Sequence, residues 1–418
     1  MNRPITCLHL ADIHFGVEAY GYTNPATGLN TRLEDFSSSL EQAVDRALSE
    51  PVDLVLFAGD AYKRNNPSPT EQRELVKHFC RLADAGIPTV MISGNHDIPV
   101  MHGKASSIDI FRRLRPGMFY VCVNQPTVGD SPPFVVDTKN GPIAVCCLPY
   151  ISPSFLRNLE PYKDLKSEEL SDACQEYYHD VITAMPERIP SETPRLLLAH
   201  LSLHGALLGG YRGSLLMSEE VQLPPMELAA AGYDYVALGH IHRYQNLSPI
   251  PNVPVVYPGS IDRVDFGEAE ENKGFVIARI QRGGAEHEFV PVSVRPFCSI
   301  HIECDPGEDI TEKILTAITR EEISRAVVRL SYVADDAEAQ ALDMKRIQEA
   351  LRPAHFKAGF FRIPRESVSK RRSSTLSREA TLADALAAYI REHEELKDEG
   401  PALLEKAKDI AAVVQDGL

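Results

Sequence analysis

The stretch VMISGNHDIP, residues 90–99, ends an apolar run with a glycine and then places three polar side chains in a row. These are the amide of Asn95, the imidazole of His96 and the carboxylate of Asp97. An apolar run that ends in a polar turn is typical of a buried strand in an α/β sheet. Ligands of open α/β sheets collect at the carboxyl ends of the strands. The stretch therefore predicts a strand whose end carries functional residues.

The same rhythm extends outward from this stretch through residue 150. Short β-rich runs that end in polar turns alternate with helical stretches, at residues 5–12, 33–50, 52–60, 68–86 and 87–97. Three further strands of this kind are predicted at residues 142–150, 194–205 and 233–244, and the last two carry histidines at their ends. A βαβαβ succession indicates a sheet flanked by helices.

Composition limits the kind of protein. A chain of 418 residues is too long for one ordinary core and suggests two or three domains. With 44% hydrophobic and 24% charged residues, and no apolar run near the roughly 20 residues of a membrane helix, we expect a soluble globular protein without membrane contact. The start carries no secretory hydrophobic region, so we expect a cytoplasmic protein. Eight cysteines without a CxxC pair indicate reduced thiols.

The distribution of charge restricts contact with nucleic acid. A net charge of −16 argues against broad, non-specific attraction to a polyanion, so any such contact must be local or assisted by metal ions. One local exception is the stretch from Arg352 to Arg378, which has eight Lys or Arg residues against one acid, Glu366. This stretch either holds DNA or is a solvated linker.

A different unit begins near Arg295. Its predicted order is β-α-β-α-β, at residues 295–304, 309–319, 325–333, 337–352 and 359–364, which indicates a small α+β domain. The last forty residues then hold two amphipathic helical patterns separated by Gly400–Pro401, a helix stop followed by a start. Two such short helices either fold back on the core or hold a partner, and we favour a partner.

Five strand-end motifs carry side chains of the kinds that bind metal ions. They are ADIHFG, FAGDAY, SGNHD, LAHLSLHG and ALGHIHRY, and they supply Asp12, His14, Asp60, Asn95, His96, His200, His240 and His242. Alternation along an extended segment puts residues i and i+2 on one side, so the two polar residues of D-x-H or H-x-H can bind at the same site. One motif alone says little, whereas five in order, each closing an apolar run, indicate a shared metal site.

The order of these motifs, D-x-H, GD, GNH[DE], H and GHxH, resembles the calcineurin-like metallophosphoesterases over residues 5 to about 290. GHIHRYQ, YPGSIDRVDFGE, the small second domain and the two-helix tail further resemble the SbcD family, the nuclease subunits of bacterial SbcCD complexes. The resemblance implies an α/β fold: a four-layer metallophosphoesterase β-sandwich flanked by helices, with a small α+β capping domain and a C-terminal helical hairpin. The implied parts are a nuclease domain (1–293), a DNA-binding capping domain (294–368), a basic linker (369–378) and a two-helix ATPase-binding motif (379–418).

The resemblance also implies two divalent metal ions. One would be held by Asp12, His14, Asp60 and His242, and the other by Asp60, Asn95, His200 and His240, with Asp60 bridging. Imidazole, carboxylate and amide ligands without a thiolate suit Mn²⁺ or Fe²⁺. The family's usual nuclease cofactor is Mn²⁺, and Fe²⁺ or Mg²⁺ are substitutes.

His96 holds no metal in this scheme. It would face the scissile phosphate and donate a proton to the leaving 3′ oxygen as a general acid, with Asp97 as the second catalytic residue that orients the imidazole. Alternatively, Asp97 is a turn residue that accepts hydrogen bonds from nearby backbone amides. Lys63 stands where archaeal relatives often have a histidine, and it either contacts DNA phosphate or is solvated. Arg32 and Arg212 lie in polar, glycine-rich segments beside the site and are candidates for substrate contact.

By resemblance, the chain is a Mn²⁺-dependent DNA nuclease, an exonuclease on duplex ends and an endonuclease on single strands or hairpins, in DNA repair, recombination and replication. Its partners would be DNA, an SbcC-type coiled-coil ATPase bound through residues 379–418, and a second copy of the chain in a homodimer. Two other interpretations stay open: a metallophosphoesterase for nucleotides or phosphoproteins, and a metal-silent scaffold for the ATPase. The second domain and tail weigh against the former, and the complete ligand set weighs against the latter.

Overall fold

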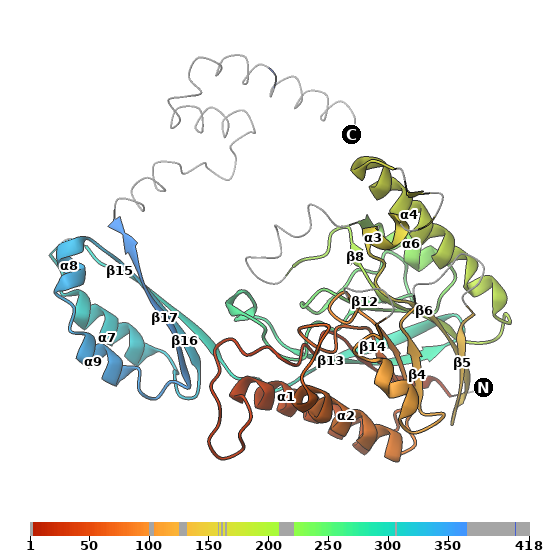
Figure 1. Ribbon diagram of the computed structural model, residues 1–418, viewed down its shortest axis with the longest axis horizontal. Helices are drawn as coiled ribbons and strands as arrows, with labels where there is room; N and C mark the ends of the chain where they lie inside the picture. Colours follow the sequence, from red (N-terminus) through yellow and green to blue (C-terminus); the bar gives the residue numbers. More distant parts are fainter. Residues whose placement is uncertain are drawn as a thin grey trace. The chain divides into compact units, whose positions relative to one another are not determined.

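The structure, a computed structural model, describes residues 3–99, 104–124, 132–157, 159, 162–163, 165–208, 221–305, 307–365 and 406. The chain divides into two compact units, Met1–Phe297 and Cys298–Leu418 (Figure 1). The predicted basic linker, the two-helix tail apart from Lys406, and Arg212 lie outside the described residues. No helix within the described ranges is both long and apolar enough to cross a membrane. All eight cysteines are free thiols.

The first sheet of the larger unit contains the strands that the opening pattern predicts. Its order is β14-β13-β1-β2-β3-β4, with β1 to β4 parallel and the hairpin β13-β14 joined antiparallel to β1. The strands are β1 (Ile5–Leu10), β2 (Leu54–Phe57), β3 (Thr89–Ile92), β4 (Phe119–Cys122), β13 (Gly274–Gln281) and β14 (Gly284–Pro291). Helices α1 (Thr31–Ser49) and α2 (Pro69–Asp84) connect β1, β2 and β3, so the βαβαβ succession is confirmed.

The second sheet has the order β11-β12-β10-β7-β6-β5. Its strands are β5 (Phe134–Thr138), β6 (Gly141–Leu148), β7 (Arg195–His200), β10 (Tyr235–Gly239), β11 (Gln245–Asn246) and β12 (Val255–Tyr257). The four inner strands are parallel, and β5 and β11 pair antiparallel at the edges. Smaller elements are β8 (Ser202–Leu203), β9 (Gln222–Leu223), α3 (Pro153–Arg157), α4 (Ser167–Ala184), α6 (Pro225–Ala230), and the 3-10 turns η1 (Asp109–Arg113), η3 (Pro186–Arg188) and η4 (Phe266–Glu268).

Three apolar cores hold these elements in four layers. In β1, Leu8 and Leu10 pack against α1 and α2, whereas Ile5 and Cys7 pack between the two sheets. A third core, which includes Leu197, joins the second sheet to α4 and α6. Figure 1 shows α1 and α2 on one side of the sheets and α4 and α6 on the other. The predicted four-layer sandwich is therefore confirmed. Because the central strands are buried on both faces, they form continuous apolar runs in the sequence.

Helix α2 begins at a complete start signal. The Ser68 side chain accepts a hydrogen bond from the Glu71 amide, the Glu71 carboxylate accepts one from the Ser68 amide, and Pro69 occupies the first turn. This capping box fixes where the loop after β2 turns into helix.

The smaller unit is a three-stranded sheet with helices. Its order is β15-β16-β17, with β16 and β17 parallel. The elements are β15 (Phe297–Glu303), α7 (Ile310–Arg320), β16 (Val327–Ala334), α8 (Asp336–Gln340), α9 (Met344–Ala350) and β17 (Phe356–Pro364). The sequence predicts one helix over residues 337–352, but two form because the Asp343 side chain caps α9 through the Arg346 amide. The use of this unit as a DNA-binding cap stays a prediction.

Candidate metal centre

The five strand-end motifs meet at one edge of the sheets in the larger unit. Asp12 and His14 follow β1, Asp60 follows β2, Asn95 follows β3, His200 ends β7, and His240 and His242 follow β10. The first two loops are tied together, because the Asp12 amide donates to the Gly59 carbonyl at 3.0 Å. The structure therefore brings together all seven residues that the sequence predicts as ligands, as expected at the carboxyl ends of neighbouring strands.

The first group of side chains comprises Asp12, His14 and His242. Their ligand atoms lie within 4.8 Å of one another. The Nε2 atoms of His14 and His242 are 2.9 Å apart, and Nε2 of His14 is 3.9 Å from a carboxylate oxygen of Asp12. Two imidazole nitrogens and a carboxylate at these separations can contact one cation together.

The second group comprises Asn95, His200 and His240. The Asn95 amide oxygen lies 3.0 Å from Nε2 of His200 and 3.2 Å from Nδ1 of His240. Asp60 lies between the two groups, because its Oδ2 is 3.7 Å from Nε2 of His14 and 3.7 Å from Nε2 of His200. A carboxylate in this position can contact cations held by both groups.

The backbone of these loops is strained. The angle φ is 51° at Asp12, 50° at His14, 59° at Asp60 and 100° at His240, in the left-handed region that favours glycine. Close packing adds a second constraint, because a Cβ atom on Gly94 would lie 2.1 Å from Oδ1 of Asp60. Strain of this kind persists only where surrounding contacts enforce it, and it is typical of functional sites.

The surroundings of the two groups fit divalent cations. Nδ1 of His200 donates to the Ala58 carbonyl at 2.7 Å, and Nδ1 of His242 donates to the Glu268 carboxylate at 2.7 Å. The Nε2 atoms of both rings therefore present lone pairs to the site. Burial raises the pKa of Asp12 to about 7, and no Lys or Arg of the described residues forms an ion pair with it. A divalent cation would supply the missing positive charge.

His96 lies at the rim of the site. Its side chain is 35% exposed, whereas His14 and His200 are fully buried. Nδ1 lies 3.0 Å from the Lys63 carbonyl, which can only accept, so Nδ1 carries a proton. Nε2 lies 4.0 Å from Oδ2 of Asp60. Burial lowers the pKa of His96 even though Asp60 opposes this shift.

The geometry contradicts the prediction that Asp97 orients His96. The Asp97 carboxylate is fully buried. It accepts hydrogen bonds of 2.8 to 3.1 Å from three backbone amides and one hydroxyl, those of Asp60, Ala61, Gly94 and Ser107. The Lys63 carbonyl contacts the His96 ring instead. The alternative therefore holds: Asp97 is a turn residue, and it ties the loop of Asn95 to the loop of Asp60.

Arg32 and Lys63 differ in what surrounds them. Arg32 is fully buried, and its guanidinium pairs with Asp35 at 2.7 Å and with Asp262 at 3.3 Å, so it serves the core and is not a substrate contact. The Lys63 ammonium group has no hydrogen bond or ion pair in the part of the chain that the structure describes. Lys63 therefore remains a candidate for phosphate contact.

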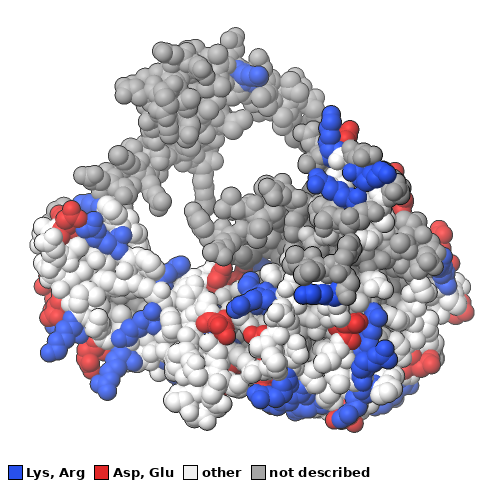
Figure 2. Space-filling view, in the orientation of Figure 1, with Lys and Arg blue, Asp and Glu red and all other residues white. Residues whose placement is uncertain are grey.

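The described part of the basic stretch is largely neutralised. Three of its arginines pair with acids of the same unit: Arg352 with Glu349, Arg362 with Asp336, and Arg365 with Glu338. On the visible face in Figure 2, acidic atoms lie among the basic atoms of this unit. The count of basic residues along the sequence overstates the free positive charge, because the partner acids precede the stretch.

Three residues near the site were not singled out by the sequence motifs. Glu268 and Lys273 are buried behind His242, and Lys273 pairs with Glu268 at 2.8 Å. Tyr150 lies beside the second group, with its ring centroid 6.0 Å from that of His240. The sequence carries only a weak signal for the pair of Glu268 and Lys273. Glu268 ends the motif VDFGE, and Lys273 follows it five residues later.

Comparison with known proteins identifies the family. Residues 5–244 match the calcineurin-like phosphoesterases, and the chain belongs to this family, which uses a dinuclear metal centre. The DNA double-strand break repair protein Mre11 of Aeropyrum pernix is 28% identical over 321 residues, covering 75% of this chain and 67% of that protein. The D subunit of the nuclease SbcCD of Staphylococcus epidermidis is 25% identical over 333 residues, covering 78% of this chain and 80% of that protein. The uncharacterized metallophosphoesterase YhaO of Bacillus subtilis is 25% identical over 293 residues, covering 69% of this chain and 60% of that protein.

Proposed function

We propose that this calcineurin-like phosphoesterase is a metal-dependent DNA nuclease, the nuclease subunit of an SbcC–SbcD-type complex that processes and repairs DNA ends. The observation that carries the proposal is the convergence of seven carboxylate, imidazole and amide side chains from five strand ends. Two relatives named as a break-repair protein and a nuclease subunit, similar over three quarters of the chain, support the substrate class.

The metal ligands are proposed in two sets that share one carboxylate. One set is Asp12, His14, Asp60 and His242, and the other is Asp60, Asn95, His200 and His240. When bound, two divalent cations, proposed to be Mn²⁺, supply positive charge at the phosphodiester and lower the pKa of the attacking water. The strained loops contribute by fixing the ligands in advance, so little reorganisation is needed when substrate binds.

His96 is proposed to act on the leaving group. Its Nδ1 is occupied by the Lys63 carbonyl, which fixes the ring, and its partly exposed Nε2 is left for the substrate. Because burial lowers its pKa, the imidazole is mostly neutral in the free protein. The negative charge of an arriving phosphate would favour its protonation, which is the state a general acid needs.

The proposed substrates and partners extend beyond the site. We propose duplex ends, hairpins and single strands of DNA as substrates, a coiled-coil ATPase as the partner of residues 379–418, and a homodimer as the assembly. The names of the relatives support DNA and a complex with a second protein. The amphipathic pattern of the tail supports a docking role.

A cleavage assay tests the enzymatic proposal. End-labelled duplex, hairpin and single-stranded DNA are incubated with the purified chain and Mn²⁺, Mg²⁺ or EDTA, beside nucleotide and phosphopeptide substrates. We expect DNA cleavage with Mn²⁺ that EDTA abolishes. Turnover of nucleotides or phosphopeptides without DNA cleavage would favour a small-substrate phosphoesterase, and no hydrolysis at all would favour a scaffold.

A truncation tests the proposed tether. Deleting residues 379–418 should abolish co-purification with the ATPase while leaving Mn²⁺ binding and cleavage of short single-stranded DNA largely intact. Full affinity of the truncated chain for the ATPase would contradict the assignment. Sedimentation of the full chain tests the homodimer separately.

A further inference from the structure

A buried ion pair, Glu268 and Lys273, lies against His242 on the side away from the metal centre. Neither residue is a proposed metal ligand. The Glu268 side chain is 3% exposed and that of Lys273 is fully buried. Oε1 of Glu268 accepts from Nδ1 of His242 at 2.7 Å, and Oε2 accepts from Nζ of Lys273 at 2.8 Å. Nζ of Lys273 also donates to the backbone carbonyl of His242 at 3.0 Å. The pair therefore forms hydrogen bonds with both the ring and the backbone of His242.

The remaining contacts of Glu268 hold its carboxylate in one orientation. Oε2 also accepts from the Val264 amide at 2.9 Å and lies 3.4 Å from the Ser260 hydroxyl. The Ser260 hydroxyl donates its proton to the Asp262 carbonyl at 2.9 Å, whereas the Lys273 ammonium group and the Val264 amide can only donate. Oε2 therefore faces two obligate donors, and only an acceptor fits there. A carboxylate accepts through both oxygens, whereas a glutamine would turn a donating amide group toward other donors.

We propose that Glu268, fixed by Lys273, is a positioning residue that sets the tautomer and orientation of His242 and thereby tightens the metal position formed by Asp12, His14 and His242. The inference rests on the metal centre proposed above. Because Glu268 only accepts, Nδ1 of His242 must donate, and its Nε2 lone pair is directed into the site. A carboxylate on the far nitrogen also makes the imidazole a stronger donor to a metal ion.

His14 and His200 lack this arrangement. Nδ1 of His200 has a neutral backbone carbonyl as its partner, and Nδ1 of His14 has no hydrogen-bond partner among the described residues. A carboxylate raises ligand basicity more than a neutral carbonyl does. Of these three rings, that of His242 should therefore be the strongest donor to a metal ion.

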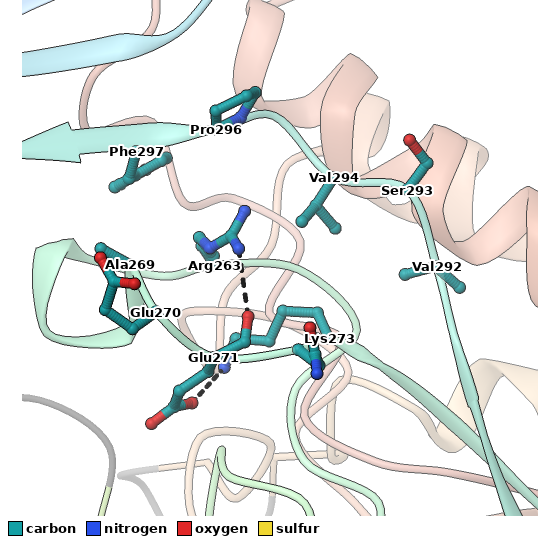
Figure 3. A pocket seen from close by; sticks show the side chains of 11 residues that line it. Arg263, Ala269, Glu270, Glu271, Lys273, Val292, Ser293, Val294, Pro296 and Phe297 are labelled. Atoms are coloured by element: carbon teal, nitrogen blue, oxygen red, sulfur yellow. Dashed lines mark hydrogen bonds and ion pairs between the residues drawn. The ribbon is translucent and has the colours of Figure 1, made fainter. Parts of the chain in front are cut away.

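The adjacent cavity does not offer a competing explanation for the buried lysine. This cavity has a volume of about 410 Å³ and is lined by Arg263, Glu271 and Lys273 among others. Figure 3 shows these side chains. Arg263 donates to the Glu271 carbonyl at 3.1 Å and to two further carbonyls, and Lys273 donates to the Glu271 carboxylate at 2.8 Å. Both cations are thus already satisfied by the protein, so Lys273 acts on Glu268 and is not held ready for an anion in the cavity.

Calorimetric titration of the full chain with Mn²⁺ tests the proposal independently of cleavage. In Glu268→Gln we expect one of the two sites to weaken by about 10- to 100-fold, the usual effect of losing such a partner, and the other to be unchanged. Lys273→Met should weaken the same site. The matched control is Glu270→Gln, the same change at an exposed acid two residues away, which should bind like the wild type. Unchanged affinity in Glu268→Gln, or equal weakening of both sites, would overturn the proposal.

A second measurement reads the wild-type protein and uses a variant only to assign its signals. Long-range ¹⁵N spectra of histidine-labelled wild-type protein, with the His242 signals assigned by their loss in His242→Gln, report the tautomer of the neutral ring. We expect the proton on Nδ1, and a proton on Nε2 would overturn the inference. If the wild type bound no Mn²⁺, the proposed metal centre would fail, whereas the tautomer would still decide the role of Glu268.

Discussion

The larger unit buries the acidic side chains of its strand-end loops, whereas the smaller unit keeps acidic side chains at its surface beside arginines. Asp12 is fully buried and Asp60 is 2% exposed, and within the described residues neither forms an ion pair with a lysine or arginine. In the smaller unit, Arg362 pairs with Asp336, whose side chain is 84% exposed.

Charged side chains therefore have different roles in the two units. A buried carboxylate without a countercharge is costly, so the strand-end loops are arranged for a cation that comes from outside the chain. An exposed ion pair contributes little and is screened by salt, so the pairs of the smaller unit mainly cancel one another's fields. Substitutions should therefore have large effects in the first region and small effects in the second.

Asp60→Ala should have the largest effect, because it removes the carboxylate between the two ligand groups. We expect loss of both Mn²⁺ ions and a fall in DNA cleavage beyond the roughly 10²- to 10³-fold that loss of one electrostatic donor costs. Elemental analysis of the dialysed protein measures the ions. The control is Asp45→Ala, a change at an exposed acid of the same unit. Retention of one ion at full occupancy would contradict the bridging role.

His96→Ala should separate chemistry from metal binding. We expect both ions to stay while DNA cleavage falls by about 10²- to 10⁴-fold, the usual contribution of a general acid. An ester with a nitrophenolate leaving group needs no proton, so its hydrolysis should fall far less. Because Nε2 of His96 is 4.0 Å from Asp60, the geometry also admits His96 as a ligand. Loss of an ion in the variant would establish that role instead.

The grouping of the candidate ligands was predictable because its signal is local. Asp12, Asp60 and Asn95 each come within three residues of the end of an apolar run, and strand ends of one sheet meet at one edge. The same runs, buried on both faces, predict the layered sandwich. Local spacing therefore predicted that side chains from distant parts of the chain share one site, whereas their division into two ligand sets came from the resemblance to the family.

Contacts between distant segments carry no such signal. Glu268 reaches His242 from 26 residues away, and Arg32 reaches Asp262 from 230 residues away. Adjacency also misleads: Asp97 follows His96 in the sequence, yet its carboxylate accepts from backbone amides and not from the imidazole. These partners are set by packing, which residue types and spacing do not specify.

Arg32→Met should show what a buried charge costs when its partner is removed. The change leaves Asp262 buried without its arginine, and such a loss typically destabilises by about 3 to 5 kcal/mol. The control is Arg46→Met in the same helix, where the arginine is 37% exposed and pairs with Glu50, a type of pair worth roughly 0.3 to 0.5 kcal/mol. Urea unfolding followed by circular dichroism suits a chain without tryptophan. Equal destabilisation by both changes would contradict the contrast.

The smallest effect is expected from Arg362→Gln combined with Arg365→Gln. Each phosphate contact to duplex DNA contributes about 0.9 to the slope of log affinity against log salt. Because both arginines already pair with acids, Asp336 and Glu338, the double variant should change this slope by less than about 0.5.

Arg243→Gln is the comparison, since Arg243 is exposed beside the metal centre and its guanidinium has no partner among the described residues. That single change should lower the slope by about 0.9. If the slope of log affinity against log salt fell by about 1.8 in the double variant, DNA would displace the acids from both arginines. The stretch from Arg352 to Arg378 would then bind phosphate, as its number of basic residues suggests.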